Sequence, residues 1–382
     1  MSHLDRLTMP HVLRVSCALT VLVLCTSLAG CSSDKPKPTA LEAFEAKVNM
    51  RQVWSARVDS VKFPLVVASR NGQFALAGTD GQVLVLQADN GSEKSRASAG
   101  AGVSAGAGSD GRFTSVATSG NEIVTFEAGR ELWRQRVPAR VVTAPFVAGE
   151  RVFVMSVDRV VHAFDALDGR RIWTLQRPGD ALTLAQGGVL TSYRNLLLVG
   201  QGARLTAIDP LRGTVQWEVP IASPRGTNEV ERLADLIGPA TRTGDRICAR
   251  AFQSAVGCVD ASRGSLLWTR NNAGAQAVAA DDERVVGADA SDRITAWKAT
   301  TGDVLWSNER MLNRGLSGAL IAGNSVVMGD SEGFVHFLSL TTGETQQRLA
   351  TDGSPVVGTP AMAGGTVLVT TRNGGLFAFR SN

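Results

Sequence analysis

The sequence lacks a strong excess of either charge. Its 382 residues hold 39 Lys and Arg against 35 Asp and Glu, which leaves a formal net charge of +4. So small and dispersed an excess does not indicate a nucleic-acid partner. Aromatic residues are scarce at 5%, but hydrophobic residues reach 44%, which excludes a disordered or collagen-like chain. Composition therefore predicts a folded protein and leaves its function open.

The sequence also lacks the patterns of common enzymes and metal sites. It contains no adjacent cysteines, no Cys-x-x-Cys, no zinc-type spacing and no Ser-His-Asp motif. Beyond residue 30 its histidines are His162 and His336, at equivalent places in a repeat described below. Residues 100–111 are mostly Gly, Ala and Ser without a lysine, which excludes a phosphate-binding loop and predicts a flexible hairpin loop. We expect no catalytic residue, no cofactor and no metal.

The first thirty residues have the pattern of an export signal. Arg14 precedes an apolar run over residues 15–28, and Leu-Ala-Gly leads directly into Cys31. A basic flank, a short apolar run and small residues are typical of a secretory signal peptide. The cysteine matches the lipobox of bacterial lipoproteins, which implies cleavage before Cys31 and its lipidation. An ordinary signal peptide with a chance cysteine is the alternative. The resemblance to such lipoproteins further implies, because Ser32 rather than Asp follows the cysteine, anchoring on the periplasmic face of the outer membrane.

Residues 31–49 are predicted to connect this anchor to the folded domain. Residues 32–39 are polar and include two prolines, a composition that favours an extended tether. Leu41, Phe44 and Val48 share one helical face, which favours a short helix over residues 41–48.

Two further cysteines, Cys248 and Cys258, stand ten residues apart in strand-like runs. At this spacing they would face the same side of a hairpin centred near Gln253. An oxidising periplasm permits a disulfide between them. Two small, unbonded core residues are the other interpretation, and both stay open.

A unit of about 40 residues recurs along the chain. Each copy has alternating apolar runs and then a Gly followed four residues later by Trp. The pairs are Gly129 and Trp133, Gly169 and Trp173, Gly213 and Trp217, Gly264 and Trp268, and Gly302 and Trp306. Two degenerate copies have Ser95 and Gln347 at the tryptophan position, and Trp54 occupies it in an opening copy. The sequence thus contains eight units.

The runs within each unit predict β-hairpins, because they alternate with period two and are joined by Gly and Asp. A lone four-stranded sheet leaves its faces exposed, whereas eight sheets arranged radially bury them against one another. We therefore predict an all-β fold over residues 50–382, an eight-bladed β-propeller of four-stranded antiparallel blades. The strand carrying Trp54 would close the ring beside the C-terminal strand 375–380. Tryptophans that recur once per blade are predicted to pack between blades rather than to stack on a ligand.

The Gly-x-x-x-Trp unit resembles the repeat of quinoprotein (pyrroloquinoline quinone) dehydrogenases and their non-catalytic, PQQ-like relatives. Over essentially the whole chain after residue 30, the sequence resembles the BamB family, the propeller lipoproteins of the outer-membrane β-barrel assembly (Bam) machinery. The lipobox, the eight units and the stretches 225–235 and 329–336 carry this resemblance.

Two irregular segments interrupt the strand pattern. Residues 223–238 interleave charged and apolar side chains, which favours an interaction loop over a merely solvated one. Residues 178–187 present Leu182 and Leu184 at strand spacing. The resemblance implies that both segments contact the periplasmic domains of the barrel-forming subunit, with Leu182, Leu184 and Asp235 at positions that the family uses.

The sequence departs from the family at two positions of this contact. Ala185 stands where an arginine is expected, and Ile237 stands where a second acidic residue is expected. Arg225, Glu229 and Arg232 are available for alternative polar contacts. The predicted partner-binding residues are therefore Leu182, Leu184, Arg225, Glu229, Arg232 and Asp235.

Two functions follow from the resemblance. The first is a non-catalytic scaffold that docks on the barrel-forming subunit and aids the folding and insertion of β-barrel proteins, with blade edges that would accept unfolded clients by strand addition. The alternative is a periplasmic quinone-dependent dehydrogenase, which would need an acidic cation pocket, a catalytic aspartate and often vicinal cysteines. Aspartates such as Asp165, Asp209 and Asp260 recur in phase with the repeat and are interpreted as turn residues, which favours the scaffold.

Overall fold

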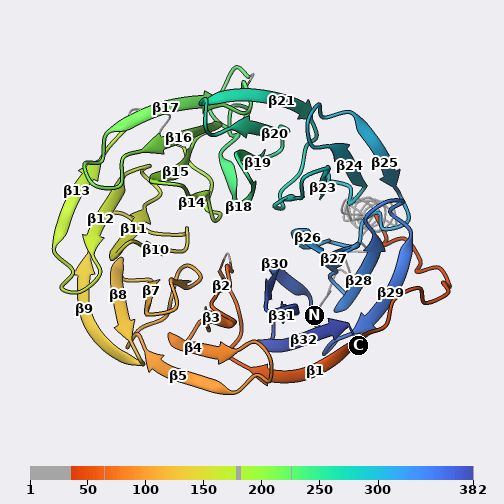
Figure 1. The fold of residues 1–382 in the computed structure, drawn as a ribbon, viewed down its shortest axis with the longest axis horizontal. Coiled ribbons are helices and arrows are strands. Elements are labelled where there is room, and N and C mark those ends of the chain that lie inside the picture. Colours follow the sequence, from red (N-terminus) through yellow and green to blue (C-terminus); the bar gives the residue numbers. More distant parts are fainter. Residues whose placement is uncertain (1–35, 64, 178–181, 225, 382) are drawn as a thin grey trace, which may run out of the picture. The chain divides into compact units, whose positions relative to one another are not determined.

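Each sequence repeat folds into one antiparallel sheet. The apolar side chains of this sheet point to both of its faces, and both faces become buried when the sheet packs between two neighbouring sheets. The computed structural model describes residues 36–63, 65–177, 182–224 and 226–381. Within these residues, strands β1 to β32 form four-stranded sheets that follow one another around a ring in the unit Pro38–Asn382 (Figure 1). The predicted eight-bladed propeller is confirmed. No helix among the described residues has the length and apolar character needed to cross a bilayer.

Blades 1 to 7 each use four consecutive strands, the first of which lies innermost (Figure 1). Blade 1 contains β2 (Ala68–Arg70), β3 (Gln73–Ala77), β4 (Gln82–Gln87) and β5 (Glu93–Ser98). Blade 2 contains β6 (Gly108–Ser109), β7 (Phe113–Ala117), β8 (Glu122–Glu127) and β9 (Arg130–Arg136). Blade 3 contains β10 (Phe146–Ala148), β11 (Arg151–Met155), β12 (Val161–Asp165) and β13 (Arg171–Leu175). Blade 4 contains β14 (Leu190–Tyr193), β15 (Leu196–Gln201), β16 (Arg204–Ile208) and β17 (Val215–Pro220).

The later blades repeat this order. Blade 5 contains β18 (Leu236–Thr243), β19 (Arg246–Ala251), β20 (Ala255–Asp260) and β21 (Ser265–Asn271). Blade 6 contains β22 (Ala279–Ala280), β23 (Arg284–Ala288), β24 (Ile294–Lys298) and β25 (Val304–Asn308). Blade 7 contains β26 (Leu320–Ala322), β27 (Ser325–Gly329), β28 (Phe334–Ser339) and β29 (Thr345–Ala350).

Blade 8 closes the ring. It joins β30 (Val356–Ala363), β31 (Thr366–Thr371) and β32 (Gly375–Ser381) to the N-terminal strand β1 (Met50–Arg57), which lies outermost and pairs antiparallel with β32. Trp54 stands opposite Ala378, as the predicted closure requires. The two ends of the propeller are thus held together by a ladder of backbone hydrogen bonds.

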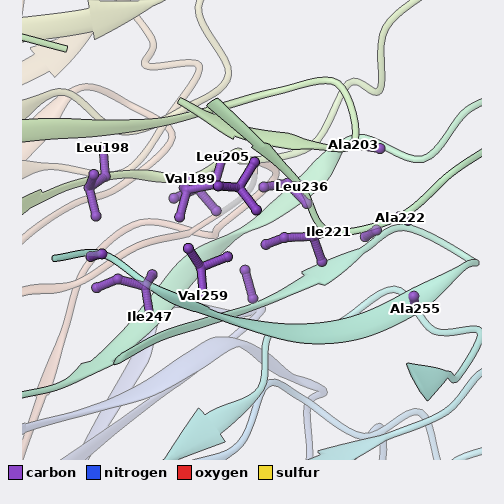
Figure 2. Close-up of a cluster of buried hydrophobic side chains, with 14 of the residues drawn as sticks. Val189, Leu198, Ala203, Leu205, Ile221, Ala222, Leu236, Ile247, Ala255 and Val259 are labelled. Atoms are coloured by element: carbon purple, nitrogen blue, oxygen red, sulfur yellow. The ribbon is translucent and has the colours of Figure 1, made fainter. Parts of the chain in front are cut away.

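The core lies at the junctions between blades rather than in one central mass. Among the residues that the structure describes, the buried apolar side chains form eight clusters, one at each junction. Figure 2 shows the cluster between blades 4 and 5, where Leu198 and Leu205 of one blade meet Ile247 and Val259 of the next. Every sheet therefore contributes to two clusters, one on each face, because successive apolar side chains of its inner strands point to opposite faces.

Each tryptophan of the Gly-x-x-x-Trp repeat position packs on the glycine of the following blade. The ring of Trp173 lies on Gly213, where an added Cβ would come within 2.7 Å of the ring, and its Nε1 donates to the Pro210 carbonyl oxygen at 2.9 Å. The same ring contact joins Trp54 to Gly91, Trp133 to Gly169, Trp217 to Gly264, Trp268 to Gly302 and Trp306 to Gly343. With a φ of +71°, Gly213 also makes a turn that other residues disfavour. The tryptophans are therefore structural, as predicted.

Every outermost strand carries a β-bulge at the residue before the tryptophan position. A bulge interrupts the hydrogen-bonding ladder and bends the strand, a common protection of exposed edges. Strand addition by an extended client could therefore be continuous only on one side of each bulge.

The segment 38–49 contains no helix, so the short helix predicted over residues 41–48 is wrong. The Thr39 amide donates to the Leu312 carbonyl oxygen in the connection between blades 6 and 7, and the Lys47 amide donates to the Gln346 carbonyl oxygen on the outermost strand of blade 7, both at 2.9 Å. Leu41 packs against the cluster between blades 6 and 7, and Val48 against the cluster between blades 7 and 8. Its apolar residues thus contact two different junctions instead of one helix-binding surface.

The Gly-rich stretch 100–111 is not the predicted flexible hairpin loop. It connects blade 1 to blade 2 and is largely buried. A Cβ on Gly108 would lie 1.8 Å from the Pro145 carbonyl oxygen, and one on Gly106 would lie 2.4 Å from that of Val66. The small residues are needed because neighbouring backbones approach this closely, not because the chain must bend freely.

Cys248 and Cys258 are directly opposite each other in β19 and β20, on a hairpin whose turn contains Gln253. Their Cα atoms are 4.1 Å apart and a disulfide joins them. Both cysteines are also buried in the cluster between blades 5 and 6. The pair is therefore a disulfide that also forms part of the core, and the unbonded alternative does not hold.

Candidate docking site

The two irregular segments are connections between neighbouring blades. Residues 176–189 lead from β13 to β14, and residues 221–235, here called the insertion, lead from β17 to β18. Each runs from an outermost strand to the innermost strand of the next blade (Figure 1). Because the two connections are equivalent in the repeat, both emerge on the same face of the ring. Of the predicted functional positions, Cys31 and Arg225 lie outside the described residues, as do the signal peptide and residues 178–181.

The insertion is anchored at both ends in the core. Ile221 and Ala222 at its start are buried in the cluster between blades 4 and 5 (Figure 2), and Ala234, just before β18, belongs to the same cluster. Between them Glu231 makes a tight turn, accepting hydrogen bonds from the Thr227 amide at 2.7 Å and its hydroxyl at 3.2 Å. These bonds lower the pKa of Glu231.

The tip of the insertion projects into solvent. Val230 is 71% exposed and Glu229 is also exposed, while Arg232 is half-buried. A groove of about 740 Å³ separates the insertion from strand β21, and Val230, Leu233 and Leu266 are among its lining residues. The insertion therefore offers both charged and apolar side chains to a partner.

Residues 182–187, here called the docking loop, lie against the insertion. Leu182 is 37% exposed, Ala185 is exposed and Leu184 is half-buried. The Leu184 amide donates to Asp235 Oδ2 at 2.9 Å, which ties the loop to the end of the insertion. Leu182 and Asp235 are thus brought together, but the carboxylate faces the loop.

Arg159 completes this contact and was missed by the sequence analysis. It lies in the turn between β11 and β12, and its Nη2 donates to Asp235 Oδ1 at 3.2 Å and to the Leu182 carbonyl oxygen at 3.3 Å. Arg159 and Asp235 side chains are only 14% and 17% exposed. Because the two residues are 76 positions apart, no local motif connects them.

Ile237, the second departure from the family pattern, is buried and therefore cannot contact a partner. Its side chain is 4% exposed in β18, and its backbone forms an isolated bridge to Gly188. An acidic side chain here would be buried. Of the two departures, only Ala185 changes the accessible surface.

The other family-like stretch, residues 329–336, forms a buried polar cluster in blade 7. Asp330 Oδ2 accepts from Arg314 Nε at 2.9 Å and lies 2.9 Å from His336 Nε2. Arg314 Nη1 also donates to the Thr39 carbonyl oxygen at 2.9 Å, and Arg348 Nε lies 3.4 Å from His336 Nδ1. The cluster therefore holds the segment 38–49 against blade 7 through Thr39, while Ser331 and Glu332 of the same stretch are exposed.

The charges of this cluster are set by its surroundings. Burial would raise the pKa of Asp330, but hydrogen bonds from His336 and the Phe334 amide, together with Arg314, lower it to about 2. Burial lowers the pKa of His336, and the neighbouring Arg348 and Arg314 add to this effect against the opposing Asp330. A neutral ring with its proton on Nε2 satisfies both neighbours, because Nδ1 then accepts from Arg348.

Repeat, ring and loops together define the class: a PQQ-like repeat propeller whose distinctive features are loops on one face. A family model described as outer membrane protein assembly factor BamB matches residues 79–308, which is more than half of the chain. The outer membrane protein assembly factor BamB of Burkholderia pseudomallei is 35% identical over 373 residues, covering 96% of this chain and 97% of the relative. The chain therefore belongs to the BamB family of outer membrane protein assembly factors, which are not enzymes.

Solved structures agree with the fold. The crystal structure of BamB from Moraxella catarrhalis matches with a TM-score of 0.79 at 19% identity, over 87% of this chain and all of that one. The quinohemoprotein alcohol dehydrogenase of Comamonas testosteroni matches with a TM-score of 0.64 at 15% identity, over 86% of this chain and 76% of that one. At such identities the likeness concerns the fold alone.

Proposed function

We propose that the chain is the lipid-anchored scaffold subunit of the β-barrel assembly machinery, and that it docks on the periplasmic domains of the barrel-forming subunit. Cleavage before Cys31 and lipidation of that residue would hold the propeller at the periplasmic face of the outer membrane. Membership in the BamB family and the lipobox sequence support this assignment.

The observation that carries the proposal is the exposed Leu182 on a loop held by internal hydrogen bonds. An apolar side chain that is already ordered loses little entropy on binding. Ala185 adds exposed apolar surface to the same loop, and Glu229 and Arg232 of the insertion would supply a polar rim, with Arg225 proposed for it from the sequence alone. A rigid ring with two such loops on one face suits a scaffold that positions another subunit.

Replacing Leu182 by Ala tests the proposal. We expect the purified chain to bind the detergent-solubilised barrel-forming subunit at least about tenfold more weakly after this change, because the anchor loses most of its apolar area. Leu211→Ala is the matched control, since Leu211 is 59% exposed in the turn that precedes β17, at the end opposite to the insertion. Equal affinities of both variants and the native chain, measured by calorimetry, would place the docking site elsewhere.

A further inference from the structure

The turn between the second and third strands of each blade places one residue in the left-handed region of φ. The eight residues are Gly81, Asn121, Arg159, Gly202, Gln253, Asp292, Gly333 and Gly374. Glycine, asparagine and aspartate are the residues that this conformation favours. Arg159 has a φ of +63°, so a long charged residue occupies a position whose backbone conformation favours glycine, asparagine or aspartate.

The contacts of the Arg159 side chain explain why an arginine occupies this position. It spans from the turn of blade 3 to the docking loop and to the insertion, through the Leu182 carbonyl oxygen at 3.3 Å and Asp235 Oδ1 at 3.2 Å. Its backbone is held in turn by Gln201 Nε2, which donates to the Arg159 carbonyl oxygen at 2.9 Å. A glycine or asparagine would suit the turn but could not reach either group.

Both carboxylate oxygens of Asp235 are engaged within the chain. Oδ1 accepts from Arg159 and Oδ2 accepts from the Leu184 amide at 2.9 Å. Because both oxygens already accept a hydrogen bond from the docking loop or from Arg159, and the side chain is only 17% exposed, the carboxylate is directed to contacts within the chain. We infer that Arg159 is a positioning residue of the docking site, and that Asp235 acts by ordering the docking loop rather than by contacting the barrel-forming subunit. This inference rests on the proposed function.

A double-mutant cycle tests the inference. Arg159→Met, Asp235→Ala and the double variant are compared for affinity to the detergent-solubilised barrel-forming subunit. Each single change should weaken binding about fivefold or more, and the double variant should bind no more weakly than the weaker single variant, because both remove the same contact. Arg159→Lys, which keeps the charge and a donor, should recover part of the loss. Losses that multiply in the double variant would show that Asp235 contacts the partner directly, and the inference would be overturned.

Amide hydrogen exchange of the free chain provides a test that needs no partner. Arg159→Met and Asp235→Ala should both speed exchange in residues 182–187 by about tenfold, most clearly at the Leu184 amide, while the strands of blades 3 to 5 keep their protection. Glu229→Ala is the control, because its exposed side chain lies outside the contact. Unchanged exchange in Arg159→Met would refute the positioning role. If the native chain fails to bind the barrel-forming subunit, the proposed function fails, and exchange still decides whether Arg159 orders the loop.

Discussion

At the scale of single residues, the tryptophan of one blade and the residue it packs on in the next blade depend on each other. Where Gln347 replaces the tryptophan, Met50 replaces the glycine, and the amide of Gln347 binds the Met50 backbone nitrogen at 2.7 Å and carbonyl oxygen at 2.8 Å. A tryptophan ring at position 347 would meet the Met50 side chain, since the other rings leave room only for glycine. The degenerate copy is thus adapted to hold the strand that closes the ring.

We predict that Trp173→Ala lowers the free energy of unfolding by about 3–5 kcal/mol, as large core truncations do. The change removes the ring from the cluster between blades 3 and 4 and leaves the Pro210 carbonyl oxygen without its donor. Ser95→Ala, at the same repeat position but without a ring, should stay within about 0.5 kcal/mol of the native chain. Urea unfolding measures the stability of both variants. If Trp173→Ala were as stable as the native chain, the structural role of the tryptophan would be disproved.

Sequence patterns predict side chains that recur and miss those whose partners are backbone groups or distant in the chain. The structural role of the repeat tryptophans could be predicted because the same tryptophan–glycine contact recurs between successive blades. Arg250 could not, because it is fully buried and its guanidinium donates to three carbonyl oxygens, those of Asn272, Gln276 and Ala288, at 2.6 to 2.8 Å. Carbonyl oxygens belong to every residue and leave no motif.

At the scale of elements, blade 7 and the N-terminal segment form a joint unit. The buried cluster of Arg314, Asp330 and His336 contacts Thr39, and the Arg348 guanidinium lies 5.1 Å from the centre of the Phe44 ring. The outer edge of blade 7 is thereby covered. Leu41, Phe44 and Val48 have the spacing of a helical face, but a segment without a helix can have the same spacing when its apolar residues contact two different junctions. The Gly-rich stretch 100–111 misled for a similar reason, since close backbone approach and flexibility select the same residues.

The pH dependence of stability follows from His336. Its pKa in the folded chain is lowered from 6.5, so the unfolded chain takes up the proton first as the pH falls. The free energy of unfolding should therefore decrease between about pH 7 and pH 5. His336→Gln, which can still donate to Asp330, should flatten this decrease; the remainder belongs to His162, whose pKa burial also lowers. Urea unfolding across this pH range would contradict the account if the variant lost stability as steeply as the native chain.

At the scale of the whole molecule, the eight junction clusters make a ring in which no blade is stable by itself and the final ladder joins both ends. The number of blades and the closing strand could be predicted from the repeat, because each unit must bury its two faces against its neighbours. The orientation of the docking loop could not, since it depends on contacts among residues of blades 3 to 5. A ring built in this way leaves its connections free to vary, and the candidate site lies on two of them.

The measurement that tests the central claim most directly is site-specific photo-cross-linking in living cells, with a photoreactive residue at position 182 of the full chain. The account predicts a cross-link from position 182 to the barrel-forming subunit, and none from position 211 at the other end of β17. A cross-link from position 211 and none from position 182 would contradict the docking site and the scaffold mechanism built on it.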